Sequence, residues 1–257
     1  MSRIFDAYAA YYDLLYQDKD YEAEANFVRG LLSKYSAEMG NKLLELGCGT
    51  GRHAEIFSRM GYAVHGIDLS EAMVNAAGSR KYSDCLVEPI YTVGDVRSIR
   101  LEKLFNVVIS LFHVASYQTS NLDLKNMFLT VAEHLHPGGI FIFDCWYGPG
   151  VLTDLPKNRV KKMISEEFEV TRIANPTIYP NSNLVDVGFN VEVVEKATRK
   201  VSHIAEIHKM RYLFKPEIDY LLGEVGLRCI EVLEWMTDRQ AGLETWTAVF
   251  VIKKEDF

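Results

Sequence analysis

The sequence predicts an α/β fold with a parallel sheet flanked by helices, together with a smaller antiparallel β region inserted late in the chain. Three observations support this prediction. The apolar run 43–46 has the character of a buried strand and ends abruptly in glycines at alternate positions, after which a helical pattern begins. Further strand-like runs are separated by helical patterns. From residue 158 onward, apolar and polar residues alternate with a period of two, which is typical of antiparallel strands.

Length and composition allow one domain with a sizeable core. The chain has 257 residues, of which 48% are hydrophobic, enough for a single core with an added subdomain. Its net charge is −7, and the basic pairs Lys161-Lys162 and Arg199-Lys200 are short and isolated. We interpret both pairs as solvated surface charge, so nucleic acid is not an expected partner. An anionic substrate would need a local basic pocket.

The cysteines and the apolar runs bear on metals and on compartment. Four cysteines occur without metal-ligand spacing and without a C-x-x-C motif, so no metal site is predicted. They are interpreted as the reduced cysteines of a cytoplasmic protein. The sequence contains no charged-then-apolar signal segment and no apolar run of membrane-spanning length, so no membrane association is expected.

The glycine-rich segment after the first strand is the most informative motif. Gly47, Gly49 and Gly51 would form a turn that tolerates positive φ angles and lets a ligand lie against the backbone. The spacing differs from the dinucleotide fingerprint G-x-G-x-x-G. Glu45, at the end of the strand, would be a poor neighbour for a pyrophosphate but a good partner for a cationic ligand. Asp68 ends the second strand, where a carboxylate can accept both hydroxyls of a ribose.

Two segments carry a resemblance to a known family. Residues 45–51 (Glu-Leu-Gly-Cys-Gly-Thr-Gly) and 66–70 (Gly-Ile-Asp-Leu-Ser) resemble the class I S-adenosylmethionine-dependent methyltransferases. The resemblance covers 41–145 well and implies a Rossmann-like seven-stranded sheet that binds S-adenosylmethionine. It implies that the glycine loop lies under the methionine part of the cofactor, that Asp68 binds the ribose, and that Asp95 and Val96 contact the adenine. The cofactor-binding residues expected from it are Glu45, Gly47, Cys48, Gly49, Gly51, Asp68, Leu69, Met73, Asp95, Val96, Leu111, Phe112 and Tyr12.

The segment before the first strand is rich in tyrosines. Tyr8, Tyr12 and Leu15 are spaced for one face of a helix. The pattern Tyr12-Asp13-x-x-Tyr16 resembles a segment that acts as a lid on cofactor and substrate in small-molecule methyltransferases. A tyrosine can cover an apolar ligand and still donate a hydrogen bond. The alternative is that these tyrosines only pack the helix onto the sheet.

The second half of the chain would close the substrate side. Alternating runs at 167–173, 184–193 and 202–212 predict an antiparallel meander, with turns at Asn175-Pro176 and Pro180-Asn181. The predicted organisation is a helical lid over 1–38, a cofactor-binding core over 39–157 that ends in a loop at 146–157, an antiparallel insertion over 158–214, and the rest of the core sheet over 215–257, with a helix from Pro216 and strands at 229–235 and 246–252.

The expected chemistry is an in-line displacement. Methyl transfer from a sulfonium needs alignment and a dry site, and it needs a base only if the acceptor carries a proton. We predict His113, Tyr12 and Tyr117 as catalytic residues; the alternative for His113 is a hydrogen-bonded histidine at a strand end. His203 and His208 lie five residues apart on one predicted strand, so at most one of them should face the pocket. The residues predicted to bind substrate are Tyr8, Trp146, Tyr147, His208 and Arg211, with a surface ion pair as the alternative for Arg211.

The resemblance therefore predicts methylation of a small molecule, with transfer to an amine such as that of a nucleotide-linked amino sugar as the first choice. Methylation of oxygen or carbon is an alternative. A nicotinamide-dependent oxidoreductase is a second alternative, against which the glycine spacing and Glu45 argue. A non-catalytic binding protein is a third, made less attractive by the intact set of Glu45, Asp68 and Asp95. The sequence does not determine the oligomeric state, and a homodimer is among the options.

Overall fold

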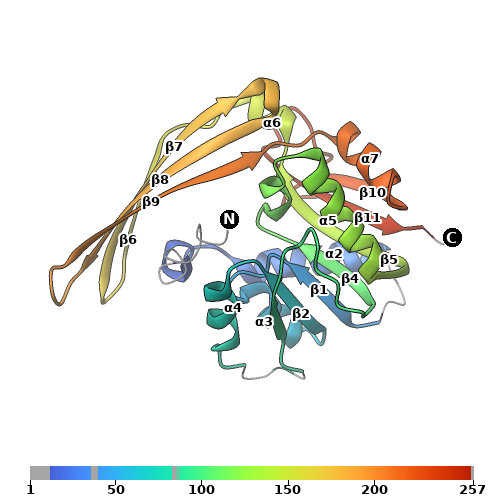
Figure 1. Cartoon of the computed structure of the whole chain (residues 1–257), viewed down its shortest axis with the longest axis horizontal. Helices are drawn as coiled ribbons and strands as arrows, with labels where there is room; N and C mark the ends of the chain where they lie inside the picture. The colour runs from blue at the N-terminus through green and yellow to red at the C-terminus, as the bar shows by residue number, and fades with distance from the viewer. Residues whose placement is uncertain (1–11, 36–39, 83–84, 86, 256–257) are drawn as a thin grey trace.

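The computed structural model describes residues 12–35, 40–82, 85 and 87–255, and these residues form two sheets. A seven-stranded sheet forms the body of the molecule, and a four-stranded sheet extends from it as an arm on the left of Figure 1. The larger sheet carries the glycine-rich segment. The smaller sheet comes from the part of the sequence with period-two alternation, as that pattern predicts.

The seven-stranded sheet is mostly parallel. Its strands are β1 (Lys42–Leu46), β2 (Ala63–Asp68), β3 (Ile90–Val93), β4 (Phe105–Ser110), β5 (Leu135–Trp146), β10 (Leu227–Glu234) and β11 (Thr247–Lys254). The order across the sheet is β10-β11-β5-β4-β1-β2-β3. Strands β3, β2, β1, β4 and β5 run in the same direction, and only β11 is antiparallel to its neighbours. The carboxyl ends of the five parallel strands therefore share one edge, where ligands bind in such sheets.

Helices cover both faces of this sheet (Figure 1). They are α2 (Tyr21–Tyr35), α3 (Arg52–Arg59), α4 (Glu71–Gly78), α5 (Asn121–His134), α6 (Gly148–Thr153) and α7 (Lys215–Gly223), with the 3-10 turns η1 (Val114–Tyr117) and η2 (Pro180–Ser182). Successive residues of a strand point to opposite faces. Leu44 and Leu46 therefore join a buried cluster with α5 and α7, whereas Leu43 joins one with α2 and α3. Complete burial of each such side chain stabilises the fold by about 2 kcal/mol.

The four-stranded sheet is antiparallel throughout. Its strands are β6 (Arg159–Ile164), β7 (Phe168–Tyr179), β8 (Leu184–Glu195) and β9 (Val201–Arg211), in that spatial order. One face is partly covered by the segment 12–16, because Leu15 is buried together with Met163, Val170, Val191 and Val193. This inner face is the one that contributes to the functional site.

The structure corrects three details of the expected organisation. Asn175 and Pro176 do not form a turn but lie within β7. The first strand, β6, pairs with β7 only as far as Ala174, so Pro176 stands at a local edge where its missing N–H is tolerated. Strand β6 itself was not predicted, and the expected loop over 146–157 contains the short helix α6.

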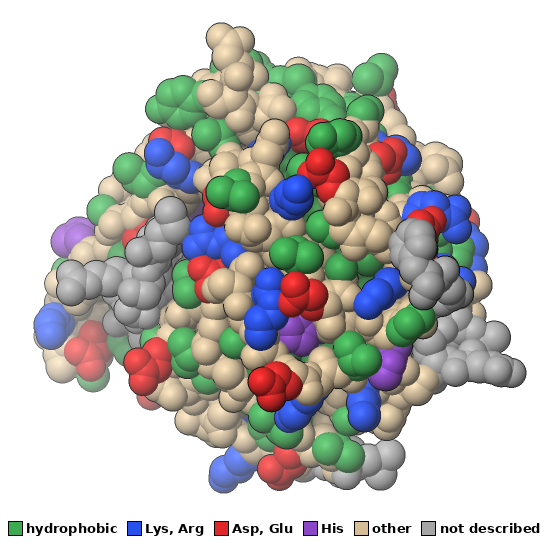
Figure 2. Space-filling model, turned by 45° about the vertical axis from the view of Figure 1, so that its right-hand side comes forward, with side chains coloured by type: hydrophobic (Ala, Val, Ile, Leu, Met, Phe, Trp, Pro, Cys, Tyr) green, Lys and Arg blue, Asp and Glu red, His purple; other side chains and the backbone are tan. Residues whose placement is uncertain are grey.

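The surface shows no grouping of charge by sign on the side that is drawn. Lysine and arginine side chains are interspersed with aspartate and glutamate on the face in Figure 2. In the described ranges of the chain, no helix is long and apolar enough to cross a membrane.

Candidate active site

A cavity of about 600 Å³ lies between the carboxyl edge of the seven-stranded sheet and the inner face of the four-stranded sheet. Residues that are far apart in the sequence line this cavity. The predicted site residues that line it are Tyr12, Gly47, Gly49, Asp68, Leu69, Met73, Asp95, Val96, Leu111, Phe112, His113, Tyr117, Trp146 and His208.

The three glycines of the loop after β1 have three different surroundings. All have positive φ, at 80° for Gly47, 53° for Gly49 and 77° for Gly51. A Cβ on Gly47 would lie 2.4 Å from Cγ2 of Val114, and a Cβ on Gly51 would lie 2.6 Å from the Tyr91 hydroxyl. A Cβ on Gly49 would meet no atom of the described residues within 4 Å, and Gly49 lines the cavity. The first and third glycines therefore serve close packing, and Gly49 presents bare backbone to a ligand.

Asp68 is held at the end of β2 by backbone donors. The N–H of Gly49 donates to its Oδ2 at 2.8 Å, and the N–H of Ser70 donates to its Oδ1 at 2.9 Å. Burial raises the pKa of Asp68, and these backbone hydrogen bonds oppose the shift. Each carboxylate oxygen has a further lone pair, so the group can still accept hydrogen bonds from a diol in the cavity.

Glu45 lies beneath the loop and outside the cavity wall. Its side chain is buried, and Oε2 has no hydrogen-bond partner among the residues that the structure describes. Burial, and to a smaller extent the charge of Asp68, raises its pKa well above the ordinary value. Oε1 lies 3.7 Å from Nδ1 of His53, whose Nε2 lies 2.9 Å from Oε2 of Glu24 in α2. A positively charged ligand at this edge would lower the raised pKa values of Glu45 and Asp68 and favour their ionised forms.

Asp95 follows β3 and is paired with Arg97. The Arg97 Nε donates to Oδ1 of Asp95 at 2.8 Å, and Nη1 donates to Asp123 at 2.8 Å. The Arg97 hydrogen bonds lower the pKa of Asp95, which is therefore ionised. Asp95 and Val96, the residues predicted to contact adenine, both line the cavity. The Asp95 carboxylate would divide its acceptor capacity between Arg97 and a ligand.

Phe112 and His113 form a strained turn at the end of β4. Their φ angles are 66° and 65°, in the left-handed region that non-glycine residues seldom adopt. Asp144 of β5 supports the turn, because the backbone N–H of His113 donates to its Oδ1 at 3.0 Å. The His113 Nδ1 lies 2.7 Å from Oδ2 of Asp144 but is not aligned for a hydrogen bond. The buried carboxylate thus fixes His113 at the cavity wall.

The N-terminal segment places two tyrosines in the cavity. Tyr12 and Tyr16 both line it, with ring centroids 4.8 Å apart. Tyr16 packs edge-on against Phe112, with a centroid distance of 4.9 Å. Leu15, between them in sequence, is fully buried against the four-stranded sheet. Packing and cavity lining therefore occur together in this segment.

Asp13 connects the same segment to the glycine loop. The Thr50 hydroxyl donates to its Oδ1 at 2.7 Å, and Arg80 makes a short ion pair with its Oδ2. Arg52, the residue that follows the third glycine, lies 3.5 Å from the same carboxylate. The position of Tyr12 is thus linked to that of the loop.

The inner face of the four-stranded sheet is basic where it lines the cavity. Alternation along the strands puts Arg159 and Lys161 of β6 and Arg172 of β7 on this face. Lys157, just before β6, joins them. The pair Lys161-Lys162 was expected to be solvated surface charge, but only Lys162 is exposed, whereas Lys161 lines the cavity. Lys157 is paired with Asp154 and Lys161 with Asp18, so Arg159 and Arg172 provide the excess positive charge of this face in a protein of net charge −7.

Several predicted site residues lie outside the cavity. Cys48 is buried against β2, with its Sγ close to Gly66, and so packs the loop. Tyr147 packs on Phe250 behind β5 and does not reach the substrate side. Tyr8 lies outside the described residues.

Arg211 also lies outside the cavity, which corrects its expected contact with substrate. Its side chain is buried, and Nη2 donates to Asn121 at 2.6 Å and to Glu217 at 2.8 Å. These bonds join β9 to α5 and α7. Arg211 is therefore paired within the fold. The structure supports neither the expected contact with substrate nor the surface ion pair that was the alternative.

Other cavity residues were not predicted as site residues. Those used below are Tyr16, Lys157, Arg159, Lys161, Arg172 and Phe189. For the charged ones the signal was present, because a strand with lysine or arginine at every second position must put those charges on one face. What the sequence does not reveal is which face of the sheet covers the cavity.

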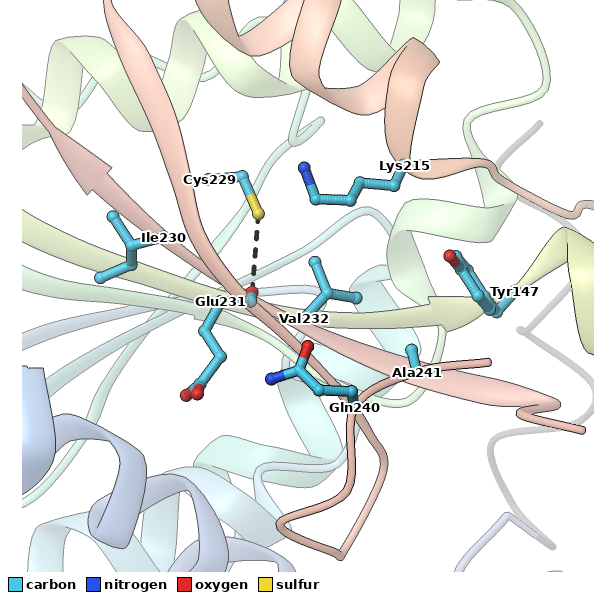
Figure 3. A pocket seen from close by; sticks show the side chains of 8 residues that line it. All are labelled: Tyr147, Lys215, Cys229, Ile230, Glu231, Val232, Gln240 and Ala241. Atoms are coloured by element: carbon cyan, nitrogen blue, oxygen red, sulfur yellow. Dashed lines mark hydrogen bonds between the residues drawn. The ribbon is translucent and has the colours of Figure 1, made fainter. Parts of the chain in front are cut away.

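A second cavity of about 290 Å³ lies beside the edge strand β10 of the large sheet (Figure 3). Its charged groups are already paired: Lys215 with Asp219, and Glu231 with Lys34. The Cys229 Sγ contacts the Glu231 carbonyl at 3.5 Å, and burial raises the pKa of this thiol to about 11. This cavity is lined by none of the glycine-loop, aspartate or histidine residues that line the large cavity.

Comparison with known proteins agrees with this geometry. The family profile described as "Methyltransferase domain" matches residues 43–139. The chain is 30% identical over 231 residues to the dTDP-3-amino-3,4,6-trideoxy-alpha-D-glucopyranose N,N-dimethyltransferase of Streptomyces venezuelae, covering 88% of this chain and 92% of the relative. It is 31% identical over 167 residues to the dTDP-4-amino-2,3,4,6-tetradeoxy-D-glucose N,N-dimethyltransferase of Saccharopolyspora spinosa, covering 60% and 65%. The crystal structure of DesVI from Streptomyces venezuelae superposes with a TM-score of 0.80 at 27% identity, covering 97% and 98%.

Proposed function

Because the chain belongs to the class I S-adenosylmethionine-dependent methyltransferases, we propose that it methylates the amino group of a nucleotide-linked amino sugar. Two relatives are named for dTDP-linked amino sugars. The observation in this chain that carries the proposal is the basic face formed by Lys157, Arg159, Lys161 and Arg172 on the substrate side of the cavity. Such a cluster suits a diphosphate, since arginine and lysine make charge-assisted hydrogen bonds to phosphate oxygens.

The residues at the sheet edge fit the cofactor. Gly49 offers bare backbone, Asp68 offers acceptors for a ribose diol, and the buried Glu45 suits the cationic end. We propose that Asp95 and Val96, which line the cavity, contact the adenine, as the family resemblance implies. S-adenosylmethionine supplies an electrophilic methyl group on a positively charged sulfur. The protein's own task is to hold the acceptor in line and to keep the site dry.

Three side chains that line the cavity are proposed to act on the acceptor amine. An amine must be neutral to attack, so its ammonium proton has to be removed first. Tyr12 comes from the lid segment, His113 from the turn supported by Asp144, and Tyr117 from η1. We propose that they orient the amine and accept its proton, with Trp146 as part of the apolar wall.

The experiment that tests this function is a methylation assay with purified protein. S-adenosylmethionine is incubated with dTDP-3-amino-3,4,6-trideoxy-α-D-glucopyranose, with the same amino sugar lacking the nucleotide, and with a 3-hydroxy analogue that keeps it. We expect one or two methyl groups on the nucleotide-linked amine by mass spectrometry. Equal rates with the free sugar would contradict the role of the basic face, and methylation of the hydroxy analogue alone would replace nitrogen by oxygen as the acceptor.

A cytoplasmic location is part of the same proposal. All four cysteines are unpaired with one another, which suits a reducing compartment. Nucleotide-linked sugars with a free amine would have to be available in that compartment.

A further inference from the structure

Three side chains form a hydrogen-bonded chain that leads away from the cavity. The Tyr117 hydroxyl lies 2.8 Å from Nδ1 of His208, and Nε2 of His208 lies 3.0 Å from Oε2 of Glu206. Alternation along β9 explains the second contact, because Glu206 and His208 are two residues apart and share the inner face. The first contact joins the four-stranded sheet to η1 at the end of β4. Tyr117 and His208 both line the cavity.

The surroundings favour a neutral imidazole. The side chain of His208 is 4% exposed, and that of Glu206 is 9% exposed. Phe189 of β8 packs edge-on against the imidazole with a centroid distance of 4.9 Å, and Arg172 of β7 lies 5.1 Å from the Phe189 ring. Burial, together with Arg172, lowers the pKa of His208 to about 4, and burial raises the pKa of Glu206 to about 7.

A neutral imidazole carries a single N–H, so the contacts of His208 with Tyr117 and Glu206 decide which nitrogen holds the proton. With Glu206 ionised, Nε2–H donates to the carboxylate and Nδ1 accepts from the Tyr117 hydroxyl. The phenol oxygen then presents a lone pair to the cavity. With Glu206 protonated, the chain reverses: the carboxyl donates to Nε2, Nδ1–H donates to Tyr117, and Tyr117 can only donate to a ligand.

A second histidine–glutamate pair on the same sheet has none of these properties. His203 of β9 and Glu192 of β8 lie 4.0 Å apart, with side chains 73% and 51% exposed. They lie on the outer face, away from the cavity. This pair supplies a matched control for the inner one.

We propose that Glu206 and His208 are positioning residues that make Tyr117 the proton acceptor for the substrate amine. The inference rests on the proposed function. In one concerted shift, the ammonium proton passes to the Tyr117 oxygen, the Tyr117 proton to Nδ1 of His208, and the Nε2 proton of His208 to Glu206. The amine becomes neutral and Glu206 becomes a carboxylic acid, so charge and protons balance without another reactant. After the product leaves, the same shift in reverse passes the proton from Glu206 through His208 and Tyr117 to water in the cavity, which restores the starting tautomer.

The relay is tested with the pH dependence of methylation of dTDP-3-amino-3,4,6-trideoxy-α-D-glucopyranose. We expect Glu206→Gln, which keeps the shape, to lower kcat near neutral pH by about 10²-fold with little change in the KM for S-adenosylmethionine. In the wild type, kcat should rise with pH near pH 7, and in Glu206→Gln this rise should disappear. Glu206→Gln combined with Tyr117→Phe should be no worse than Tyr117→Phe alone, because the residues act as a unit. Glu192→Gln should match the wild type. A Glu206→Gln enzyme with wild-type kcat and an unchanged rise with pH would overturn the relay.

A second measurement separates the relay from the choice of substrate. Nitrogen NMR of the histidine side chains in the S-adenosylhomocysteine complex should show His208 neutral, with the proton on Nε2 well above pH 7 and on Nδ1 well below it. In Glu206→Gln this change of tautomer should be lost. A charged His208 at neutral pH, or no dependence on Glu206, would overturn the relay whatever the acceptor. The expected NMR behaviour without methylation of any amino sugar would overturn the proposed function and leave the hydrogen-bonded chain in place.

Discussion

Gly49 is the single residue whose replacement tests the cofactor site most cleanly. Its Cβ position faces the cavity, so Gly49→Val would put two methyl groups in the ligand's space. We expect affinity for S-adenosylhomocysteine to fall by about a hundredfold or more, which corresponds to about 3 kcal/mol. Isothermal titration measures this loss directly.

The control for that substitution is Gly61→Val. Gly61 also has a positive φ, of 96°, and its Cβ position also meets no described atom within 4 Å, but it lies outside the cavity. Both variants strain the backbone, so both should lose thermal stability. Only Gly49→Val should lose affinity. If the two variants lost affinity equally, the glycine would act through the fold and not through space for the ligand.

Single residues also show which parts of the site could be predicted from the sequence and which could not. Asp68, Asp95 and His113 could be assigned to the cavity edge because each lies at or just after the end of a strand, and the ends of parallel strands share an edge. Tyr147 and Arg211 were misplaced because a neighbouring position in sequence does not say which way a side chain turns. His208 was separated from His203 by the period of two alone. Nothing in the sequence marks Glu206 as a site residue until His208 is known to face the cavity.

Among the elements, the segment from Tyr12 to Asp20 depends most on contacts with other parts of the chain. Asp13 connects it to the glycine loop through Thr50 and Arg80. We expect Asp13→Asn to weaken that connection, because the amide keeps one acceptor but loses the charge opposite Arg80. Such partly exposed pairs contribute on the order of 1 kcal/mol or less, so S-adenosylhomocysteine affinity should fall only a few-fold. Hydrogen exchange of the amides in 12–16 should become clearly faster.

A suitable control is Glu22→Gln, which breaks a comparable surface pair with Arg59 between α2 and α3. It should leave exchange in 12–16 unchanged. Unchanged exchange in Asp13→Asn would mean that the packing of Leu15 alone holds the segment, and the connection through Asp13 would be discarded.

The elements of the large sheet could be predicted well because their physics is local. Continuous apolar runs, glycine turns and helical periodicity mark β1, β2, β3 and β4 within a residue or two. The smaller sheet was predicted less completely. The dipeptide Asn175-Pro176 has the composition of a turn, and only the short reach of β6 explains why β7 continues through it.

At the scale of the whole molecule, the cavity has two electrically different walls. The sheet edge contributes the carboxylate of Asp68, with Glu45 buried behind the wall beneath the glycine loop, and the arm contributes Arg159, Lys161 and Arg172. The first wall suits a cationic cofactor and the second an anionic acceptor. This division could not be predicted from net charge, since it arises only when one face of the arm is laid over the carboxyl edge.

The most direct test of the account is a crystal structure of the protein with S-adenosylhomocysteine and dTDP-3-amino-3,4,6-trideoxy-α-D-glucopyranose. The account predicts the adenosyl group over Gly49 and Asp68, the diphosphate against the arginine and lysine side chains of β6 and β7, and the amine beside Tyr117. A diphosphate bound away from that basic face, with the amine remote from Tyr117, would contradict it.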